Sequence, residues 1–255
     1  LLCFFSILGC IVATAESNDN LRLGIIGIDD RRPVEQGRRR FSAIGHVNIG
    51  GYRSSGICTG TLVAPRVVLT AAHCVIDRSK KKPFRLDRVH FVAGVHRDKS
   101  KGYSRAQCLK FPNGFKYIGP KRLLPDLPFQ KVPWELFRLD LALIVLQNNI
   151  PDAEILEIDA HAKPEVGQPV IHAAYPADRR YQLMADESCT LIHHAPGLWA
   201  TTGDSHPGSS GGPVMFSQRS QTKITALMVG LQARTASLAV PLSVWPDLPL
   251  TSECP

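Results

Sequence analysis

Three segments of the chain carry polar residues that stand out against an apolar background. They are Cys58–Cys74, which ends in Thr-Ala-Ala-His-Cys, Leu139–Leu146, which begins Leu-Asp-Leu-Ala, and Gly203–Pro213, which contains Gly-Ser-Ser-Gly-Gly-Pro. A serine hydroxyl attacks an acyl carbon only when a neighbouring imidazole removes its proton, and backbone N–H groups must then stabilise the oxyanion. Glycines around Ser210 permit the sharp turn that aims two such groups at one point, with Gly208 and Ser210 as the donors.

Chain order restricts the partners of this serine. Residues 208–212 also read Gly-x-Ser-x-Gly, the nucleophile elbow of α/β hydrolases, but that fold requires a histidine after the serine and the last histidine here is His206. We therefore expect the base upstream, at His73, and a carboxylate at Asp140. Asp140 opens an otherwise uncharged apolar strand, so its partly buried carboxylate needs a hydrogen-bond donor such as an imidazole N–H. Four other histidines are interpreted as structural: His46, His90, His161 and His172.

The elements that must position these residues are predicted to be short β-strands. Val, Ile, Leu and Thr gather in short runs separated by turn residues, and a 3.6-residue period is rare. The predicted strands are 42–49, 57–63, 66–70, 88–93, 141–146, 169–174, 213–216, 224–232 and 237–240. The predicted helices are short, at 71–76 and 241–245, and residues 97–134 are expected to form long surface loops. Many strands without long helices indicate an all-β sandwich or barrel.

The composition is that of one large globular domain or two small ones. The chain has 255 residues, of which 44% are hydrophobic, and Gly and Pro make up about 15%, too few for low-complexity disorder. The formal net charge is +8. The basic clusters at 31–32, 38–40 and 80–82 lack interleaved aromatic residues, so we interpret them as solvated loops and expect no nucleic-acid binding. No apolar run reaches 18 residues, so no transmembrane span is expected.

The N-terminus reads as an export signal. Residues 1–15 are uncharged and mostly apolar and end in Ala-Thr-Ala, which predicts a signal peptide cleaved before Glu16. A buried N-terminal strand and lipid attachment at Cys10 remain as alternatives, although Leu8 fits a lipoprotein site poorly. A secreted or periplasmic location follows, and residues 16–40 form an N-terminal segment that could be a pro-region. Removal of residues 1–15 would leave five cysteines, none of them in a Cys-x-x-Cys pair. In an export compartment these five can form at most two disulfides, with one thiol left over.

Together the three segments resemble the signatures of the chymotrypsin-like (trypsin-fold) serine peptidases, in that family's order. The resemblance spans Ile25 to Leu242. It implies two antiparallel six-stranded β-barrels within residues 41–255, divided near 147–165, with a short C-terminal helix at most. It also implies that His73 is the general base and that Ser210 is the nucleophile.

The same resemblance assigns the remaining parts of the site. Asp140 would orient the imidazole and stabilise the imidazolium, while the N–H groups of Gly208 and Ser210 would form the oxyanion hole. A disulfide between Cys58 and Cys74 is implied beside the catalytic histidine. A second pair, Cys108 with Cys189, is expected as well.

One departure from trypsin affects activation. Trypsin carries Asp immediately before its nucleophile, where it pairs with the new N-terminal ammonium after zymogen cleavage, whereas this chain has Ser209. Activation by such an ion pair is therefore not expected. A small polar residue at this position resembles the pattern of the bacterial branch that includes the glutamyl endopeptidases. The same branch is resembled by residues Gly27–Arg31, the run Cys-Thr-Gly-Thr-Leu and the closing Ala239–Leu242.

Substrate selectivity is less well specified. Asp204 stands six residues before Ser210, where trypsin carries its pocket carboxylate, and a pocket role and a structural role weigh equally. Gln232 lies in the strand where glutamyl endopeptidases place a histidine, which argues against selectivity for Glu. The run Gly-Asp-Ser ending at Ser205 imitates trypsin, but only Ser210 has flanks suited to an oxyanion hole.

The sequence thus predicts a secreted serine endopeptidase that hydrolyses protein or peptide substrates through an acyl-enzyme. We expect no cofactor and no metal, and a monomer. The alternative is a catalytically silent trypsin-fold binding protein. A metallohydrolase built on His193 and His194 is disfavoured, because adjacent residues of a strand point to opposite faces and the chain lacks His-Glu-x-x-His.

Overall fold

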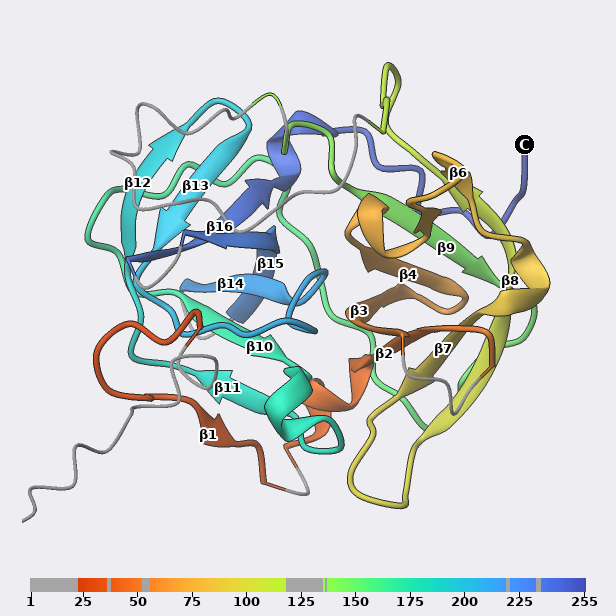
Figure 1. Ribbon diagram of the computed structural model, residues 1–255, viewed down its shortest axis with the longest axis horizontal. Coiled ribbons are helices and arrows are strands. Elements are labelled where there is room, and N and C mark those ends of the chain that lie inside the picture. Colours follow the sequence, from red (N-terminus) through yellow and green to blue (C-terminus); the bar gives the residue numbers. More distant parts are fainter. Residues whose placement is uncertain are drawn as a thin grey trace, which may run out of the picture.

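Two β-structured units lie side by side in the computed structural model of the chain (Figure 1). The structure describes residues 23–255 except 36–37, 52–55, 118–134, 136, 219–220 and 233–234. The predicted signal peptide, residues 1–15, lies outside the described residues. Within the described part, the helical segments are all short 3-10 turns, and no helix is long and apolar enough to span a membrane.

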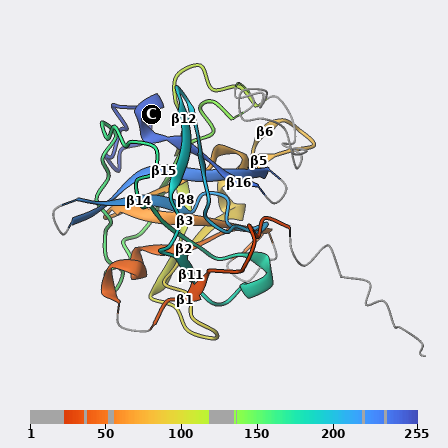
Figure 2. The same cartoon turned by 90° about the vertical axis from the view of Figure 1, so that its left-hand side faces the viewer.

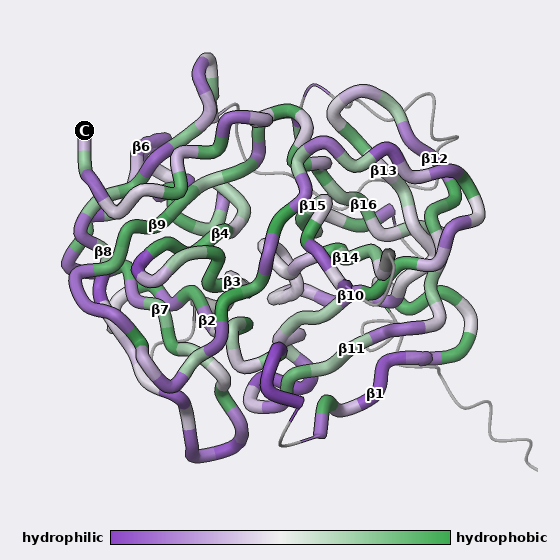
Figure 3. Tube along the Cα trace, turned by 180° about the vertical axis from the view of Figure 1, so that it is seen from behind, coloured by the Kyte–Doolittle hydropathy of each residue, from purple (hydrophilic) through white to green (hydrophobic). Residues whose placement is uncertain are grey.

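The first unit is a closed barrel in the order β2-β3-β4-β9-β8-β7, and every pairing in it is antiparallel. Its strands are β2 (Ile44–Ile49), β3 (Gly56–Ala64), β4 (Val67–Thr70), β7 (Val89–Ala93), β8 (Gly102–Lys110) and β9 (Ala142–Leu146). Figure 3 shows hydrophobic stretches along β4 and β9 and hydrophilic stretches in the peripheral loops. All nine residues of these two strands are buried, which explains why they read as continuous apolar runs.

The second unit is a sheet in the order β1-β11-β10-β14-β15-β16-β13-β12. Its strands are β1 (Arg32–Pro33), β10 (Ile171–Ala174), β11 (Met184–Asp186), β12 (Leu191–Ala195), β13 (Leu198–Thr201), β14 (Pro213–Gln218), β15 (Gln221–Gln232) and β16 (Ala236–Pro241). The chain just before β10 also bonds to the start of β12, since Val170 N–H donates to Cys189 O (2.9 Å) and Leu191 N–H to Gln168 O (3.0 Å). These bonds join the chain next to β10 to the chain at β12, so the sheet curves back on itself from β10 through β14, β15, β16 and β13 to β12, and this curved unit is called the second barrel here. The prediction of a two-barrel all-β fold is confirmed.

Short elements complete the fold. A small hairpin joins β5 (Ile76–Asp77) to β6 (Lys82–Pro83), and the 3-10 turns are η2 (Arg39–Ala43), η3 (Ala72–Cys74), η4 (Leu86–Arg88), η7 (Ala177–Arg179) and η8 (Leu242–Val244). The helices predicted at 71–76 and 241–245 are therefore only single 3-10 turns. The first turn ends because the chain enters β5 at Ile76. The second ends at Val244 because Pro246 disfavours a helical conformation at Trp245, the residue before it.

The prediction that residues 97–134 form only surface loops is wrong in part. Residues 102–110 are β8, a strand of the first barrel, while 118–134 lie outside the described residues. Exposed Tyr103, Arg105 and Gln107 alternate with buried Ser104 and Ala106. Polar outward-facing side chains and small buried ones conceal such a strand from a search for apolar runs.

The predicted pairing of Cys108 with Cys189 is wrong. Cys108 in β8 pairs with Cys254, and Cys189 is a free, buried thiol in the second barrel. The C-terminal segment returns to the first barrel (Figure 1), where Lys110 Nζ donates to the carbonyl oxygen of Thr251 (2.9 Å). This return places Cys254 beside β8, which sequence spacing could not reveal.

Candidate active site

His73 lies where β4 ends and the chain turns through η3. The preceding Ala71 and Ala72 are fully buried, so their small side chains let the turn pack against the barrel. A disulfide between Cys58 of β3 and Cys74 holds the turn covalently on the other side of His73. Within the described chain, Cys58, His73 and Cys74 form one group close enough to hold a metal ion, but its two sulfurs are bonded to each other and offer no thiolate.

Asp140 is 2% exposed and binds His73 at two points. Its Oδ1 accepts the backbone N–H of His73 (2.9 Å), and its Oδ2 accepts the ring Nδ1–H (2.7 Å). Because an ionised carboxylate only accepts hydrogen bonds, the ring proton belongs on Nδ1 and Nε2 is left as a proton acceptor.

The backbone before Asp140 is strained. Leu139 has a φ of 62°, a left-handed conformation that is rare for leucine, and Asp140 N–H donates to the carbonyl oxygen of Phe137 (3.0 Å). Such strain persists where surrounding contacts over-determine a position, and it is concentrated at functional sites.

Tyr117 is a further neighbour of Asp140. Burial raises the pKa of the Tyr117 hydroxyl, and the negative charge of Asp140 acts in the same direction.

Ser210 belongs to the second barrel, in the loop between β13 and β14, and contacts the first barrel through its backbone. Its carbonyl oxygen accepts the N–H of Thr59 in β3 (2.8 Å) and lies 3.8 Å from the sulfur of Cys74. Cys74 directly follows His73. The loop that carries Ser210 is therefore fixed against the turn that carries His73.

Glycines on both sides of Ser210 are required by space and by backbone conformation. Gly208 and Gly211 have φ values of 102° and 81°. A Cβ would lie 2.8 Å from the carbonyl oxygen of Tyr175 in the first case and 2.1 Å from that of Thr59 in the second. The N–H groups of Gly208 and Ser210 bond to no acceptor among the described residues. Both are thus free to donate to a developing negative charge.

Thr59 is a site residue that the sequence analysis did not identify. It is fully buried, and its Oγ1 donates to the carbonyl oxygen of Gly208 (3.0 Å) and accepts the N–H of Tyr175 (3.0 Å). Its own carbonyl oxygen accepts the hydroxyl of Thr70 (2.8 Å). The available signal was a polar residue in a buried strand that leads toward the histidine.

Two serines near Ser210 have structural partners. Ser209 Oγ accepts the N–H of His206 (3.2 Å), and its own N–H donates to the carbonyl oxygen of the same residue (2.9 Å), which closes a tight turn. Ser205 is 3% exposed, and its hydroxyl is bonded to that of Ser237 (2.7 Å). These contacts support the interpretation that Ser205 is not the nucleophile.

Asp204 has partners that favour its structural role over a pocket role. It is 4% exposed, and its Oδ1 accepts the N–H of Ile26 (2.7 Å) while Oδ2 accepts that of Asp30 (2.8 Å). Its backbone N–H donates to Asp186 (2.9 Å). Burial raises the pKa of Asp204, and the two N–H donors oppose that shift. Gln232, the other residue assigned to a pocket, is buried at the end of β15, and its part in selectivity stays a prediction.

The buried histidines outside the site have structural surroundings. The ring Nε2 of His46 donates to the carbonyl oxygen of Arg180 (2.8 Å), and burial lowers the pKa of His46 to about 4. His172 Nε2 bonds to the hydroxyl of Thr201 (2.9 Å), and burial lowers the pKa of His172 to about 4 as well. Both rings are therefore neutral near pH 7, which agrees with their interpretation as core residues.

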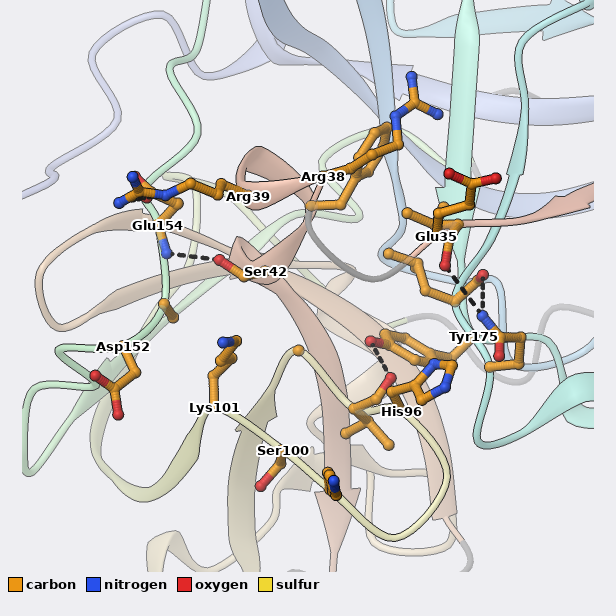
Figure 4. A pocket seen from close by; sticks show the side chains of 18 of the residues that line it. Glu35, Arg38, Arg39, Ser42, His96, Ser100, Lys101, Asp152, Glu154 and Tyr175 are labelled. Atoms are coloured by element: carbon orange, nitrogen blue, oxygen red, sulfur yellow. Dashed lines mark hydrogen bonds and ion pairs between the residues drawn. The ribbon is translucent and has the colours of Figure 1, made fainter.

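A separate cavity of about 780 Å³ lies between the N-terminal segment, the β7–β8 loop and the chain around Tyr175 (Figure 4). The hydroxyl of Tyr175 donates to the carbonyl oxygen of Val95 in its wall (2.9 Å), and Arg39 pairs with Glu154 at its rim (2.9 Å). None of the three candidate catalytic side chains lines this cavity. It is therefore distinct from the site around Ser210.

Comparisons with known proteins agree with this geometry. A family model described as a trypsin-like peptidase domain matches residues 58–221, which include all three candidate catalytic residues. The solved structure of a Glu endopeptidase in complex with MPD superposes with a TM-score of 0.67, at 20% sequence identity, over 86% of this chain and 94% of that one. Among curated proteins none matches the chain. At this identity the structural likeness establishes the fold alone.

Proposed function

Because the chain belongs to the trypsin-like peptidase family, we propose that it is a serine endopeptidase with His73, Asp140 and Ser210 as its catalytic triad. Family membership supports a peptidase that acts on protein substrates. The observation that carries the assignment of the triad is the double hydrogen bond between Asp140 and His73. It is joined by the backbone contacts that hold the Ser210 loop against Thr59 and against Cys74, the residue after His73.

In the first half of the reaction, His73 acts as general base. With the proton fixed on Nδ1 by Asp140, Nε2 takes the proton from Ser210 Oγ as the oxygen attacks the carbonyl carbon. The imidazolium that forms is stabilised by the carboxylate, which is already bonded to it. The tetrahedral oxyanion accepts hydrogen bonds from the N–H groups of Gly208 and Ser210.

The same groups complete the cycle. His73 returns its proton from Nε2 to the leaving amine, which releases the first product and leaves an acyl-enzyme on Ser210. A water molecule then gives a proton to His73 and attacks the ester carbon. Collapse of the second oxyanion releases the acid product and restores the Ser210 hydroxyl.

Location and selectivity extend the proposal. The two disulfides support an extracytoplasmic protein, and we propose export through residues 1–15 as signal peptide.

A glutamyl preference like that named for the comparison structure is not part of the proposal. Glutamyl endopeptidases place a histidine in the strand after the nucleophile, and residues 228–232 of β15 contain none.

Diisopropyl fluorophosphate labelling tests the proposed function. We expect a covalent adduct on Ser210, located by peptide mass spectrometry, together with loss of peptide hydrolysis. Ser210→Ala should abolish labelling and lower turnover by several orders of magnitude while the protein stays folded. Ser205→Ala is the matched control and should still be labelled. A folded native protein that takes up no label at Ser210 would instead favour the silent binding protein.

A further inference from the structure

Residues 24–34, called here the N-terminal strap, pack along the loop 203–210 that carries Ser210. The carbonyl oxygen of the first strap residue accepts the N–H of Ser205 (2.9 Å). The N–H of its last residue donates to the carbonyl oxygen of Leu183 (2.9 Å). Between these points the strap forms β1, which pairs with β11 (Figure 2). The strap is thus built into the second barrel by backbone hydrogen bonds.

Asp204 joins the strap to the beginning of this loop. Its two carboxylate oxygens accept N–H groups that lie four residues apart in the strap, at Ile26 and Asp30. A carboxylate that accepts two backbone N–H groups holds both in one geometry. The start of the loop is consequently anchored to chain that is more than 170 residues away in sequence.

Arg31 makes the second connection. Its side chain is 4% exposed, and the guanidinium donates to Asp29 through Nε (2.9 Å) and Nη2 (2.9 Å) and to Asp178 through Nη1 (3.2 Å) and Nη2 (2.7 Å). A buried cation is tolerated only when it is paired and hydrogen-bonded in this way. Burial alone would lower the pKa of Arg31, but the bonds to both carboxylates outweigh it, so the side chain stays charged.

The chain around Asp178 contacts the loop 203–210 near Gly208. Asp178 lies in η7, and the N–H of the neighbouring Ala177 donates to the carbonyl oxygen of Pro207 (2.7 Å). Ala177 N and Tyr175 O are also the backbone atoms that a Cβ at Gly208 would strike, at 3.0 and 2.8 Å. Gly208 therefore rests directly on the segment that Arg31 holds.

We propose that the strap is a positioning element of the active site. Arg31 acts through Asp178, and Asp204 acts by anchoring the start of the loop, so that together they hold the N–H groups of Gly208 and Ser210 in place. The proposal rests on the proposed function. Arg31 and Asp204 bond to the strap and to the chain next to the loop, and in this proposal they act on the reaction through the loop. A consequence is that the active enzyme retains residues 24–34, so removal of residues 16–40 as a pro-region is not expected, and the mature chain should begin at or before Gly24.

The test measures how fast diisopropyl fluorophosphate inactivates the full-length chain and its variants Arg31→Gln, Arg31→Lys and Asp204→Asn. This rate needs no knowledge of the substrate, and it depends on the nucleophile, the base and the oxyanion hole. Arg38→Gln is the matched control. Arg38, in the N-terminal segment, also pairs with a carboxylate, that of Glu187 (2.6 Å), but both side chains are more than 40% exposed and neither bonds to the loop 203–210.

We expect the rate constant per folded molecule to fall at least about 10-fold in Arg31→Gln and Asp204→Asn, because small displacements of preorganised donors are costly. Arg31→Lys, which keeps the charge but loses the planar fork, should be intermediate. Arg38→Gln should stay within about 2-fold of the native rate. The midpoint of the pH–rate profile should not move, since the contact between His73 and Asp140 is untouched.

A purely structural role would lower the melting temperature and leave the rate per folded molecule and its pH profile unchanged. Native rates in Asp204→Asn and Arg31→Lys, measured well below their melting temperatures, would overturn the proposal even if Arg31→Gln failed to fold. Absence of label on the native protein would instead refute the proposed function itself. A secreted form that begins after residue 34 and reacts at the native rate would also overturn the proposal.

Discussion

Replacing Asp140 with asparagine should convert His73 into the wrong tautomer. The carboxylate faces two donors of the same residue, the backbone N–H at 2.9 Å and Nδ1–H at 2.7 Å. An amide offers only one acceptor oxygen. The backbone N–H cannot change its role, so the amide oxygen must face it and the NH₂ group must face Nδ1.

The consequence for the reaction follows from proton positions. A donor NH₂ opposite Nδ1 requires that nitrogen to accept, which moves the ring proton to Nε2. Nε2 would then already carry a proton and could not remove the one on the Ser210 hydroxyl. The corresponding exchange in a serine peptidase triad lowers turnover by about 10⁴-fold, and we expect a loss of that order here. Stability should change little, because both hydrogen bonds are retained.

The assay compares kcat on one peptide substrate, the rate of fluorophosphate inactivation and the urea unfolding midpoint. Asp98→Asn, at an exposed position of the β7–β8 loop, is the matched control and should behave as the native protein. Turnover of the folded Asp140→Asn protein within 10-fold of native would refute the argument. It would show that the hydrogen bonds between Asp140 and His73 do not control the catalytic proton.

Two further predictions concern buried polar groups: two histidines outside the site and Thr59 within it. Burial lowers the pKa of His46 and of His172 from about 6.5 in the unfolded chain to about 4 in the folded protein, so both resist protonation when folded. Their neutral forms therefore contribute fully to the free energy of unfolding above pH 6.5. That contribution should be lost as the pH drops toward 4, by up to about 3 kcal/mol for each histidine. Urea unfolding from pH 7 to 4.5 should show this slope, and it should be shallower in His46→Gln but unchanged in His161→Gln, an exposed control. Thr59→Val leaves two buried peptide groups without their partner, so it should cost about 1–3 kcal/mol and slow fluorophosphate inactivation. Thr61→Val removes a buried hydroxyl of the same strand that has no hydrogen-bond partner among the described residues, so it should do neither. Equal effects in the two variants would contradict the role given to Thr59.

Local sequence patterns were sufficient for the residue types of the site and for five of the six described strands of the first barrel, but for only four of the eight in the second, where β1, β11, β12 and β13 were not predicted. Fully buried strands such as β4 and β9 read as apolar runs because both faces are covered. β8 escaped notice, since its polar residues face outward and its inward ones are small. Ser210 and His73 could be proposed as nucleophile and base because a nucleophilic serine needs glycines around it and a base elsewhere, and both demands appear as spacing along the chain.

Side-chain types and their order along the chain determined which chemistry this protein could perform, because a hydroxyl, an imidazole and a carboxylate are available as functional groups in any fold that brings them together. The tertiary structure alone decided the partners of each charge and thiol. Cys108 pairs with Cys254 because the C-terminal segment returns to the first barrel, and Asp204 binds backbone N–H groups more than 170 residues away. Such contacts depend on how distant segments pack, and no local pattern records which backbone donor or cation will come to lie beside a buried carboxylate.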